Sequence, residues 1–302
     1  MKETFPGYYK GTDLVDALKT NKIIIVLDSS VLCNLYGLPD DVWKKILDLI
    51  KIKEDCLWLP YKLAEDYHKG IIDTITNKIQ SMINLKNKLE QTQELMRAMS
   101  VSFPKMTDYV TIAKEISNRL TREIALIKQR GQKGSDIRES IAKLYKNKVG
   151  QHSNEPNSQS YKIKSYNQEV TETDAISGEN PTIIGNASKI QKQIKSRNDL
   201  ILHMLIKLSK DKEKDIVYVI TEPSEYWSIF IGKTSYGPHP EHQTYFSRNS
   251  LKHSFYCCPF ASFINHLAKS QGEELTSEFW SIVKKMSYGA TLQNADFDEV
   301  VH

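Results

Sequence analysis

The chain has 302 residues, of which 40% are hydrophobic and 26% are charged, and its formal net charge is +4. This composition predicts a folded protein with a hydrophobic core and excludes a largely disordered chain. No apolar run reaches the roughly 18 to 20 residues of a membrane span, and the first residues lack the apolar segment of a signal peptide. We therefore expect a cytoplasmic protein with no membrane partner.

The first strong element is a predicted strand over residues 23–27, Ile-Ile-Ile-Val-Leu, which ends directly at Asp28. Five consecutive aliphatic residues are typical of a strand that is buried on both faces, as in parallel sheets. A carboxylate at the carboxyl end of such a strand lies where open α/β sheets bind their ligands. Asp28 is therefore the first candidate site residue, and the alternative is that it only caps the next helix.

Helix and strand then alternate through the first quarter of the chain. Residues 40–50 predict a helix with one apolar face, and residues 56–60 predict a short apolar strand that is closed by proline. Another helix is expected to begin near Lys62 and to contain Asp66 and His68. It continues into a long helical region, so a second candidate acid lies close to the end of the second strand.

Residues 75–150 predict an inserted helical arm. Apolar residues recur at helical spacing over residues 72–89 and 112–127, with a break at 102–104, and a third short helix follows at 137–145. Residues 75–148 contain 15 Lys and Arg against 7 Asp and Glu, so this part is basic and the remainder is acidic. Such an arm could hold nucleic acid; alternatively, a long exposed helix simply uses lysine for solubility.

The α/β pattern resumes after a polar loop or linker over residues 151–194. Asp199 is expected to begin a helix, and residues 215–220 predict a second buried strand that ends just before Glu222. A further strand near residue 255 and a helix from residue 260 follow, and residues 271–302 are expected to form a C-terminal helix and tail.

Four carboxylates share one structural context, the carboxyl edge of a predicted parallel sheet: Asp28, Asp66, Asp199 and Glu222. Acids that converge there repel each other unless a cation neutralises them. Carboxylate oxygens suit Mg²⁺ or Mn²⁺, and one or two such ions could activate a water and stabilise the leaving oxygen of a phosphodiester. The alternative for each acid is an ordinary capping, turn or surface residue.

Several short motifs occur along the chain in a fixed order, at residues 5–9, 28–36, 59–69, 198–202, 215–219, 225–227 and 237–241. The run Asp-Ser-Ser-Val-Leu from Asp28 and the run Leu-Ala-Glu-Asp-Tyr-His-Lys that contains Asp66 are the most informative. Each motif is weak alone, but the ordered set resembles the PIN-like nuclease family, in particular its large bacterial branch with a helical insertion.

The resemblance implies an α/β fold, with a PIN-like, mostly parallel central sheet, helices on both faces and an inserted helical arm. The nuclease domain would then be discontinuous, formed by residues 1–74 and 195–270. The arm over 75–150, the linker over 151–194 and the tail over 271–302 would lie outside it.

The resemblance also implies a metal-dependent nuclease that holds Mg²⁺ or Mn²⁺ and usually acts on RNA, and bacterial relatives often belong to toxin or anti-phage systems. Asp28 and Asp199 match the first and third acids of the family. Asp66 stands where a glutamate is usual, and Glu222 stands where an aspartate is usual. Because one methylene moves a carboxylate by about 1 Å, these swaps predict an enzyme that prefers Mn²⁺ or a degenerate one.

Three neighbouring side chains are candidate substrate-binding residues. Ser29 and Ser30 could hold a phosphate or a water, and His68 could contact the substrate or orient a carboxylate. The competing hypothesis is a catalytically degenerate binding or assembly module. In that case the arm would bind a regulatory protein or form a homo-oligomer through its apolar stripes.

Overall fold

The computed structural model describes residue 1 and residues 14–151, 181–221, 224, 226–231, 234–251 and 253–288. Its centre is a sheet of three parallel strands, β1 (Ile23–Leu27), β2 (Asp215–Ile220) and β5 (Phe255–Pro259), in the order β1-β2-β5. All five residues of β1 are buried, as expected for a strand that is covered on both faces. Because the strands are parallel, the carboxyl ends of β1 and β2 lie at the same edge of the sheet.

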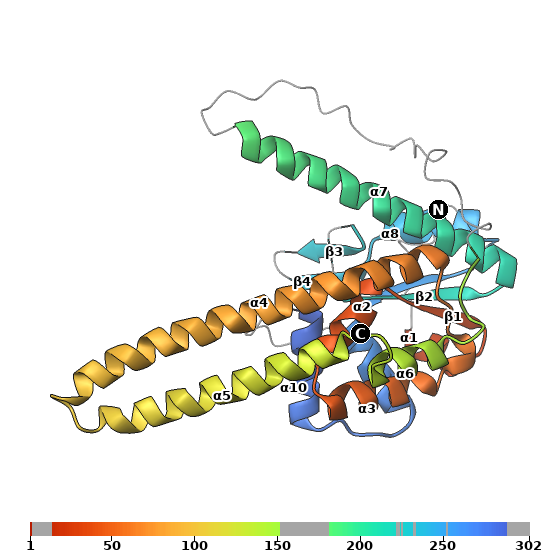
Figure 1. Cartoon of the computed structure of the whole chain (residues 1–302). Helices are drawn as coiled ribbons and strands as arrows, with labels where there is room; N and C mark the ends of the chain where they lie inside the picture. Colours follow the sequence, from red (N-terminus) through yellow and green to blue (C-terminus); the bar gives the residue numbers. More distant parts are fainter. Residues whose placement is uncertain are drawn as a thin grey trace.

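Helices surround this sheet, which confirms the predicted α/β fold (Figure 1). Figure 1 shows α7 along one side of the sheet and α3, α6 and α10 on the other. A separate antiparallel pair, β3 and β4, precedes α8. The remaining elements of the body are α1 (Leu14–Lys19), α2 (Ser29–Asn34), η2 (Leu35–Gly37), α3 (Asp40–Lys51), η3 (Glu54–Cys56), α6 (Asp136–Leu144), α7 (Pro181–Lys212), β3 (Ser228–Ile231), β4 (Thr234–Pro238), α8 (Pro240–Asn249), α9 (Phe260–Ser270) and α10 (Ser277–Tyr288).

Two long helices, α4 (Tyr61–Ser100) and α5 (Met106–Arg130), pack side by side and project from the body as a hairpin (Figure 1). The predicted helical hairpin with a break near residue 103 is therefore confirmed. The first turns of α4 belong to the body, where Leu63, Tyr67 and Ile71 are buried in the core. The helix that forms the arm thus also carries Asp66. Among the described residues, no helix is both long and apolar enough to cross a membrane.

The structure corrects two predicted elements. The helix expected to begin at Asp199 begins at Pro181, inside the predicted linker, so Asp199 lies in the helix interior. Proline suits the first turn of a helix because its fixed φ and missing N–H cost nothing there. The predicted strand over residues 56–60 is reduced to two isolated bridges, Leu57 with Ile25 and Leu59 with Val149. The preceding 3-10 turn and the following Pro60 leave this segment too short for a strand. The boundaries of the proposed domains remain predictions.

Candidate functional site

Asp28 lies at the carboxyl end of β1 and is 5% exposed. Its backbone N–H donates to the carbonyl of Val219 in β2, at 2.8 Å, which fixes the residue at the edge of the sheet. One carboxylate oxygen, Oδ1, accepts from the backbone N–H of Ser30 at 2.8 Å and from the Ser30 hydroxyl at 2.7 Å. Asp28 therefore caps α2, which was the alternative role considered for this residue. The cap uses one oxygen and leaves the other for the site.

The second oxygen of Asp28, Oδ2, accepts two further hydrogen bonds. The hydroxyl of Tyr218, in the middle of β2, donates to it, and Nη2 of Arg197 lies 3.4 Å away. Burial and the charge of Asp28 raise the pKa of Tyr218 well above its ordinary value, so the phenol keeps its proton and remains a donor. Both oxygens of Asp28 are thus bonded to protein donors.

Arg197 of α7 joins Asp28 to Asp66. Its Nε lies 3.1 Å from Oδ2 of Asp66, and its Nη2 donates to the hydroxyl of Ser29 at 3.1 Å. Burial lowers the pKa of Arg197, but Asp28 and Asp66 outweigh burial and the net shift is upward, so the guanidinium stays charged. Lys62 adds a second cation, 3.0 Å from the other oxygen of Asp66. Two carboxylates from distant parts of the sequence therefore converge on one cationic group.

The oxygen atoms around Arg197 are of the kind that hard divalent cations prefer. Besides the carboxylates of Asp28 and Asp66, the hydroxyls of Ser29, Ser30 and Thr221 lie in this cluster, and the Ser30 and Thr221 hydroxyls are 2.6 Å apart. No group of three or more His, Cys, Asp or Glu side chains that could hold a metal is found among the described residues. Mg²⁺ is usually bound through one or two carboxylates and several waters, so two carboxylates meet that requirement once Arg197 gives up its place between them.

The other two predicted acids do not join this arrangement in the described contacts. Asp199 accepts a hydrogen bond from the hydroxyl of Tyr226 at 2.5 Å, and the Tyr226 ring lies 4.5 Å from that of His242. Burial and Asp199 raise the pKa of Tyr226, which therefore remains a donor. Asp199 is two positions after Arg197, which places the two side chains on different sides of α7. Glu222 lies outside the described residues.

The three candidate substrate-binding residues have different positions. Ser29 and Ser30 lie in the carboxylate cluster through their bonds to Arg197 and Asp28. The ring of His68 lies 5.0 Å from that of Tyr67, and His68 is two residues beyond Asp66, which places it on nearly the opposite side of α4. Partial burial and the charge of Arg138 lower the pKa of His68, so this imidazole is neutral near pH 7.

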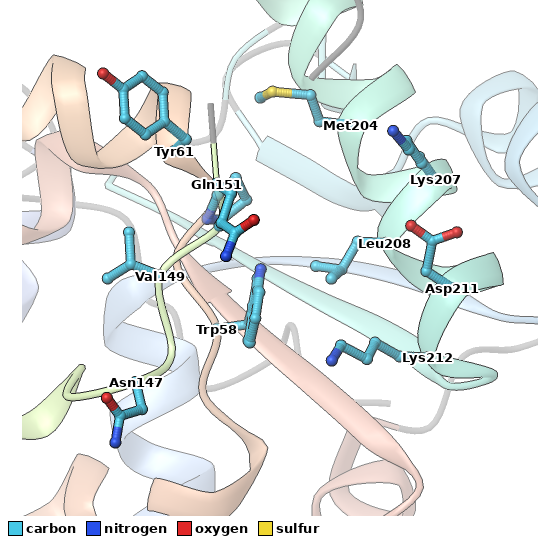
Figure 2. A pocket seen from close by; sticks show the side chains of 12 residues that line it. Trp58, Tyr61, Asn147, Val149, Gln151, Met204, Lys207, Leu208, Asp211 and Lys212 are labelled. Atoms are coloured by element: carbon cyan, nitrogen blue, oxygen red, sulfur yellow. The ribbon is translucent and has the colours of Figure 1, made fainter. Parts of the chain in front are cut away.

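A groove lies between Trp58, Tyr61 at the start of α4, the segment after α6 and the C-terminal half of α7 (Figure 2). It has a volume of about 570 Å³ and does not contain the carboxylates. Figure 2 shows the indole of Trp58 in its middle, with Lys207 and Lys212 of α7 along one wall and Tyr61 of α4 at the far side. The Lys212 ammonium is 4.7 Å from the centre of the Trp58 ring.

The groove and the carboxylate cluster share their supporting helices. Arg197 and Met204 are seven residues apart on one side of α7, a separation of about 10 Å along the axis. Tyr61 begins the helix that carries Asp66. The groove is therefore built on the two helices that carry Asp66 and Arg197, and the charged side chains that α7 contributes to its wall are Lys207, Asp211 and Lys212.

A family model described as a PIN like domain matches residues 24–242 of the chain. The match covers more than half of the sequence and includes β1, Asp28, the arm, Arg197 and β2. Domains of this kind are typically nucleases, which implies nucleic-acid binding, and they usually use divalent metals. Searches of curated proteins and of solved structures found no match.

Proposed function

Because the chain belongs to the PIN-like domain family, we propose that it is a divalent-metal-dependent endonuclease that hydrolyses phosphodiester bonds in RNA. The observation that carries this proposal is the convergence of Asp28 and Asp66 on one cationic group at the carboxyl edge of the parallel sheet. Core packing gives no reason to bring two carboxylates together there, whereas open α/β sheets bind their ligands at this edge.

Asp28 and Asp66 would hold Mg²⁺ or Mn²⁺, with Asp199 and Glu222 proposed as further acids of the site. An ion at this position supplies Lewis-acid activation of a water and charge stabilisation of the leaving oxygen. Tyr218 orients Asp28 through its hydrogen bond, so that this carboxylate presents a fixed edge to the site. Support from a neighbouring donor of this kind typically changes metal affinity or activity by about 10- to 100-fold.

Arg197 has a second use in the proposed reaction. Its planar guanidinium can bind two phosphate oxygens at once, and it lies beside the carboxylates at the point where a phosphodiester would enter. Releasing Asp28 and Asp66 to the metal would free Arg197 to neutralise the scissile phosphate. One side chain would thus balance the acids in the empty site and the phosphate in the occupied one.

The groove and the arm are the proposed binding surfaces for the strand. Unpaired bases stack on exposed aromatic rings, and lysines bind the phosphates. Trp58, Lys207 and Lys212 provide these groups in the groove, and the excess of Lys and Arg over residues 75–148 provides positive charge in the arm. A single-stranded region of RNA fits this combination, because its bases can reach the ring.

Cleavage assays with RNA and DNA substrates in Mg²⁺, Mn²⁺ and EDTA test the proposal. The informative variant is Asp28→Asn, because asparagine can still cap α2 while the negative charge that faces Tyr218 and Arg197 is removed. Circular dichroism checks that the variant is folded. We expect metal-dependent cleavage by the wild type and a loss of more than about 100-fold in the variant. The absence of cleavage by the folded wild type, with either metal and every substrate, would contradict the nuclease proposal.

One observation favours a second candidate function, a catalytically degenerate module that binds a partner. Arg197 already neutralises both Asp28 and Asp66, so the cluster is satisfied without any ion. In that case Asp28→Asn changes stability but no biological activity. A growth assay also tests the proposed role as a toxin or effector of a bacterial defence system. Expression of the wild type would arrest growth and expression of Asp28→Asn would not, whereas a degenerate module would have the same effect in both forms.

A further inference from the structure

The arm is an antiparallel coiled coil with a regular seam. The least exposed positions of each helix recur at alternating spacings of four and three residues, as in a heptad repeat. In α4 they are Ile75, Ile79, Met82, Lys86, Leu89, Gln93 and Met96, and in α5 they are Met106, Val110, Ala113, Ser117, Leu120, Ile124 and Ile127. These residues close the hairpin on itself.

A second set of apolar residues stands one position before the seam on both helices. Its members are large side chains that are 41–68% exposed: Leu85, Leu95 and Met99 of α4, and Tyr109, Ile112, Ile116 and Leu126 of α5. In a heptad whose seam is a and d, these are positions g and c, which form one flank of the helix. The exposed apolar residues therefore form a stripe along one flank of each helix.

The two stripes lie on the same face of the arm. Two hydrogen bonds between the helices fix their alignment: the Gln93 amide donates to the carbonyl of Val110, and the Ser117 hydroxyl donates to Glu90. In an antiparallel pair, the g flank of one helix adjoins the g flank of the other. This alignment brings Met99 beside Tyr109, Leu95 beside Ile112, and Leu85 towards Glu123.

The opposite face of the arm differs sharply in composition. Its positions, one residue after the seam, are mostly polar: Gln80, Asn87, Glu90, Glu94 and Arg97 of α4, and Thr111, Lys114, Asn118, Thr121 and Lys128 of α5. A two-helix arm needs only its seam to be apolar. Helices with a wider apolar sector, at a, d and g, are typical of bundles in which each helix touches two neighbours.

We propose that the outer part of this face, formed by Leu95, Met99, Tyr109, Ile112 and Ile116, binds the same surface of a second copy of the chain, so that two arms form an antiparallel four-helix bundle. A two-fold pair uses one surface twice, so the surface must complement itself. With the axis at the Leu95–Ile112 layer, Met99 and Tyr109 of one arm meet Ile116 of the other, whereas Leu85 and Leu126 lie nearer the body, outside the overlap. The two bodies then lie at opposite ends of the bundle and do not collide.

The size of the face suits a dimer. The five overlapping side chains, exposed to this degree, amount to roughly 500 Å² per arm, and pairing two arms buries about twice that, at the lower limit of specific interfaces. Lys88 and Arg119 follow the apolar layers towards the body and would form a polar rim. Interfaces with an apolar centre and a polar rim are typical of specific complexes.

Charge gives the proposed dimer a distinctive salt dependence. Residues 75–130 contain ten Lys and Arg and five Asp and Glu, so two paired arms repel each other. Salt screens this repulsion and also strengthens apolar burial when the anion is strongly hydrated. Dimerisation should therefore become tighter as salt is added, whereas binding of nucleic acid to the same arm becomes weaker.

Sedimentation velocity at several protein concentrations, with circular dichroism as a check of helix content, tests the proposal. The monomer has a mass of 34.7 kDa, and we expect the wild type to sediment as a species of twice that mass. The double variant Leu95→Glu with Ile112→Glu should weaken dimerisation by more than tenfold. The uncharged pair Leu95→Ser with Ile112→Ser should shift it in the same direction.

The matched control places the same charges on the polar face, as Asn87→Glu with Asn118→Glu, and should leave the dimer unchanged. A monomeric wild type at every concentration would overturn the proposal, as would a dimer that resists both changes at Leu95 and Ile112. Capture of the monomeric arm by lipid vesicles would also overturn it, because the face would then have another occupant. The test measures mass only, so its outcome is independent of whether the chain cleaves RNA.

Discussion

Asp28 in the body and the apolar face of the arm differ in how completely the chain satisfies them. Asp28 is buried and accepts hydrogen bonds from Ser30, Tyr218 and Arg197, which come from three separate elements. Leu95 and Ile112 on the arm are more than half exposed. Both oxygens of the Asp28 carboxylate therefore accept hydrogen bonds from the protein, whereas these two apolar side chains of the arm are largely exposed to solvent.

The difference indicates two kinds of incomplete site. A cation can enter the carboxylate cluster only if a protein group first leaves, so the cluster is expected to respond to metal through Arg197. No bond within the arm has to break when its apolar face acquires a partner, so the arm is expected to respond to protein concentration. The first region is specified by long-range contacts of the fold, and the second by a local repeat in the sequence.

The largest expected effect is on RNA cleavage, and it should differ between variants of two adjacent acids in α4, Asp66 and Glu65. Asp66 is bonded to Arg197 and Lys62, whereas Glu65 is bonded to Lys62 and to the exposed Lys69, which lower its pKa to about 2. We expect Asp66→Asn to reduce kcat/KM for RNA cleavage by more than about 100-fold. The matched variant Glu65→Gln should leave cleavage unchanged, because Asp66 keeps its bonds to Arg197 and Lys62.

Equal losses in these two variants would show that the negative charge of this turn matters and that its geometry does not. A loss in Glu65→Gln alone would place the ligand one residue earlier, at Glu65, and would remove Asp66 from the proposed site. Thermal unfolding of both variants provides the control for folding.

The next effect is on the free energy of unfolding, and it concerns Arg197, the cation between Asp28 and Asp66. Arg197→Ala removes the cation shared by Asp28 and Asp66 and leaves Lys62 beside Asp66 only, and we expect the free energy of unfolding in EDTA to fall by about 1–3 kcal/mol. Mn²⁺ should then raise Tm more in the variant than in the wild type, because metal no longer competes with the guanidinium. Arg197→Lys, which keeps the charge, serves as the control. Equal Mn²⁺ shifts in all three proteins would refute competition between Arg197 and metal.

A smaller effect is expected in the groove. In the Asp28→Asn background, which allows binding to be measured without cleavage, Trp58→Leu should weaken the affinity for single-stranded RNA by about 1–3 kcal/mol. Trp280→Leu is the matched control, because Lys284 lies 5.2 Å from the ring of Trp280 just as Lys212 lies over Trp58. Fluorescence anisotropy of labelled RNA measures both. Equal losses would argue against a stacking role for the groove.

The strands β1 and β2 could be predicted because each is a run of consecutive apolar residues, which indicates burial on both faces. Residues 23–27 are all aliphatic and residues 216–220 are all apolar, and the observed strands cover residues 23–27 and 215–220. The start of α7 could not be predicted in the same way, because the polar sequence before it favours a loop as strongly as a helix. Because the predicted helix began at Asp199, Arg197 fell outside it, and nothing in the sequence indicated that its side chain lies near the acids.

The sequence did contain an indication of the carboxylate cluster that composition alone does not reveal. A tyrosine at 218, inside a strand buried on both faces, requires a partner for its hydroxyl, and that partner is Asp28. In the arm, the fourfold spacing of Ile112, Ile116, Leu120 and Ile124 suggested one stripe. Because four residues exceed one turn by about 40°, this series crosses from the exposed face into the seam.

The smallest expected effect distinguishes the seam of the arm from its exposed face. Lys86 lies in the seam, 3.6 Å from the partly exposed Glu90, and Lys88 lies two residues further on the apolar face. Lys86→Leu should slow hydrogen exchange of the arm amides by an amount equivalent to about 1 kcal/mol, with no change in dimerisation. Lys88→Leu should instead tighten dimerisation and leave exchange in the monomer unchanged, because it enlarges only the surface that meets the second copy. If both variants changed the same quantity, the arm would have one apolar surface in place of two, and the division into seam and exposed face would be wrong.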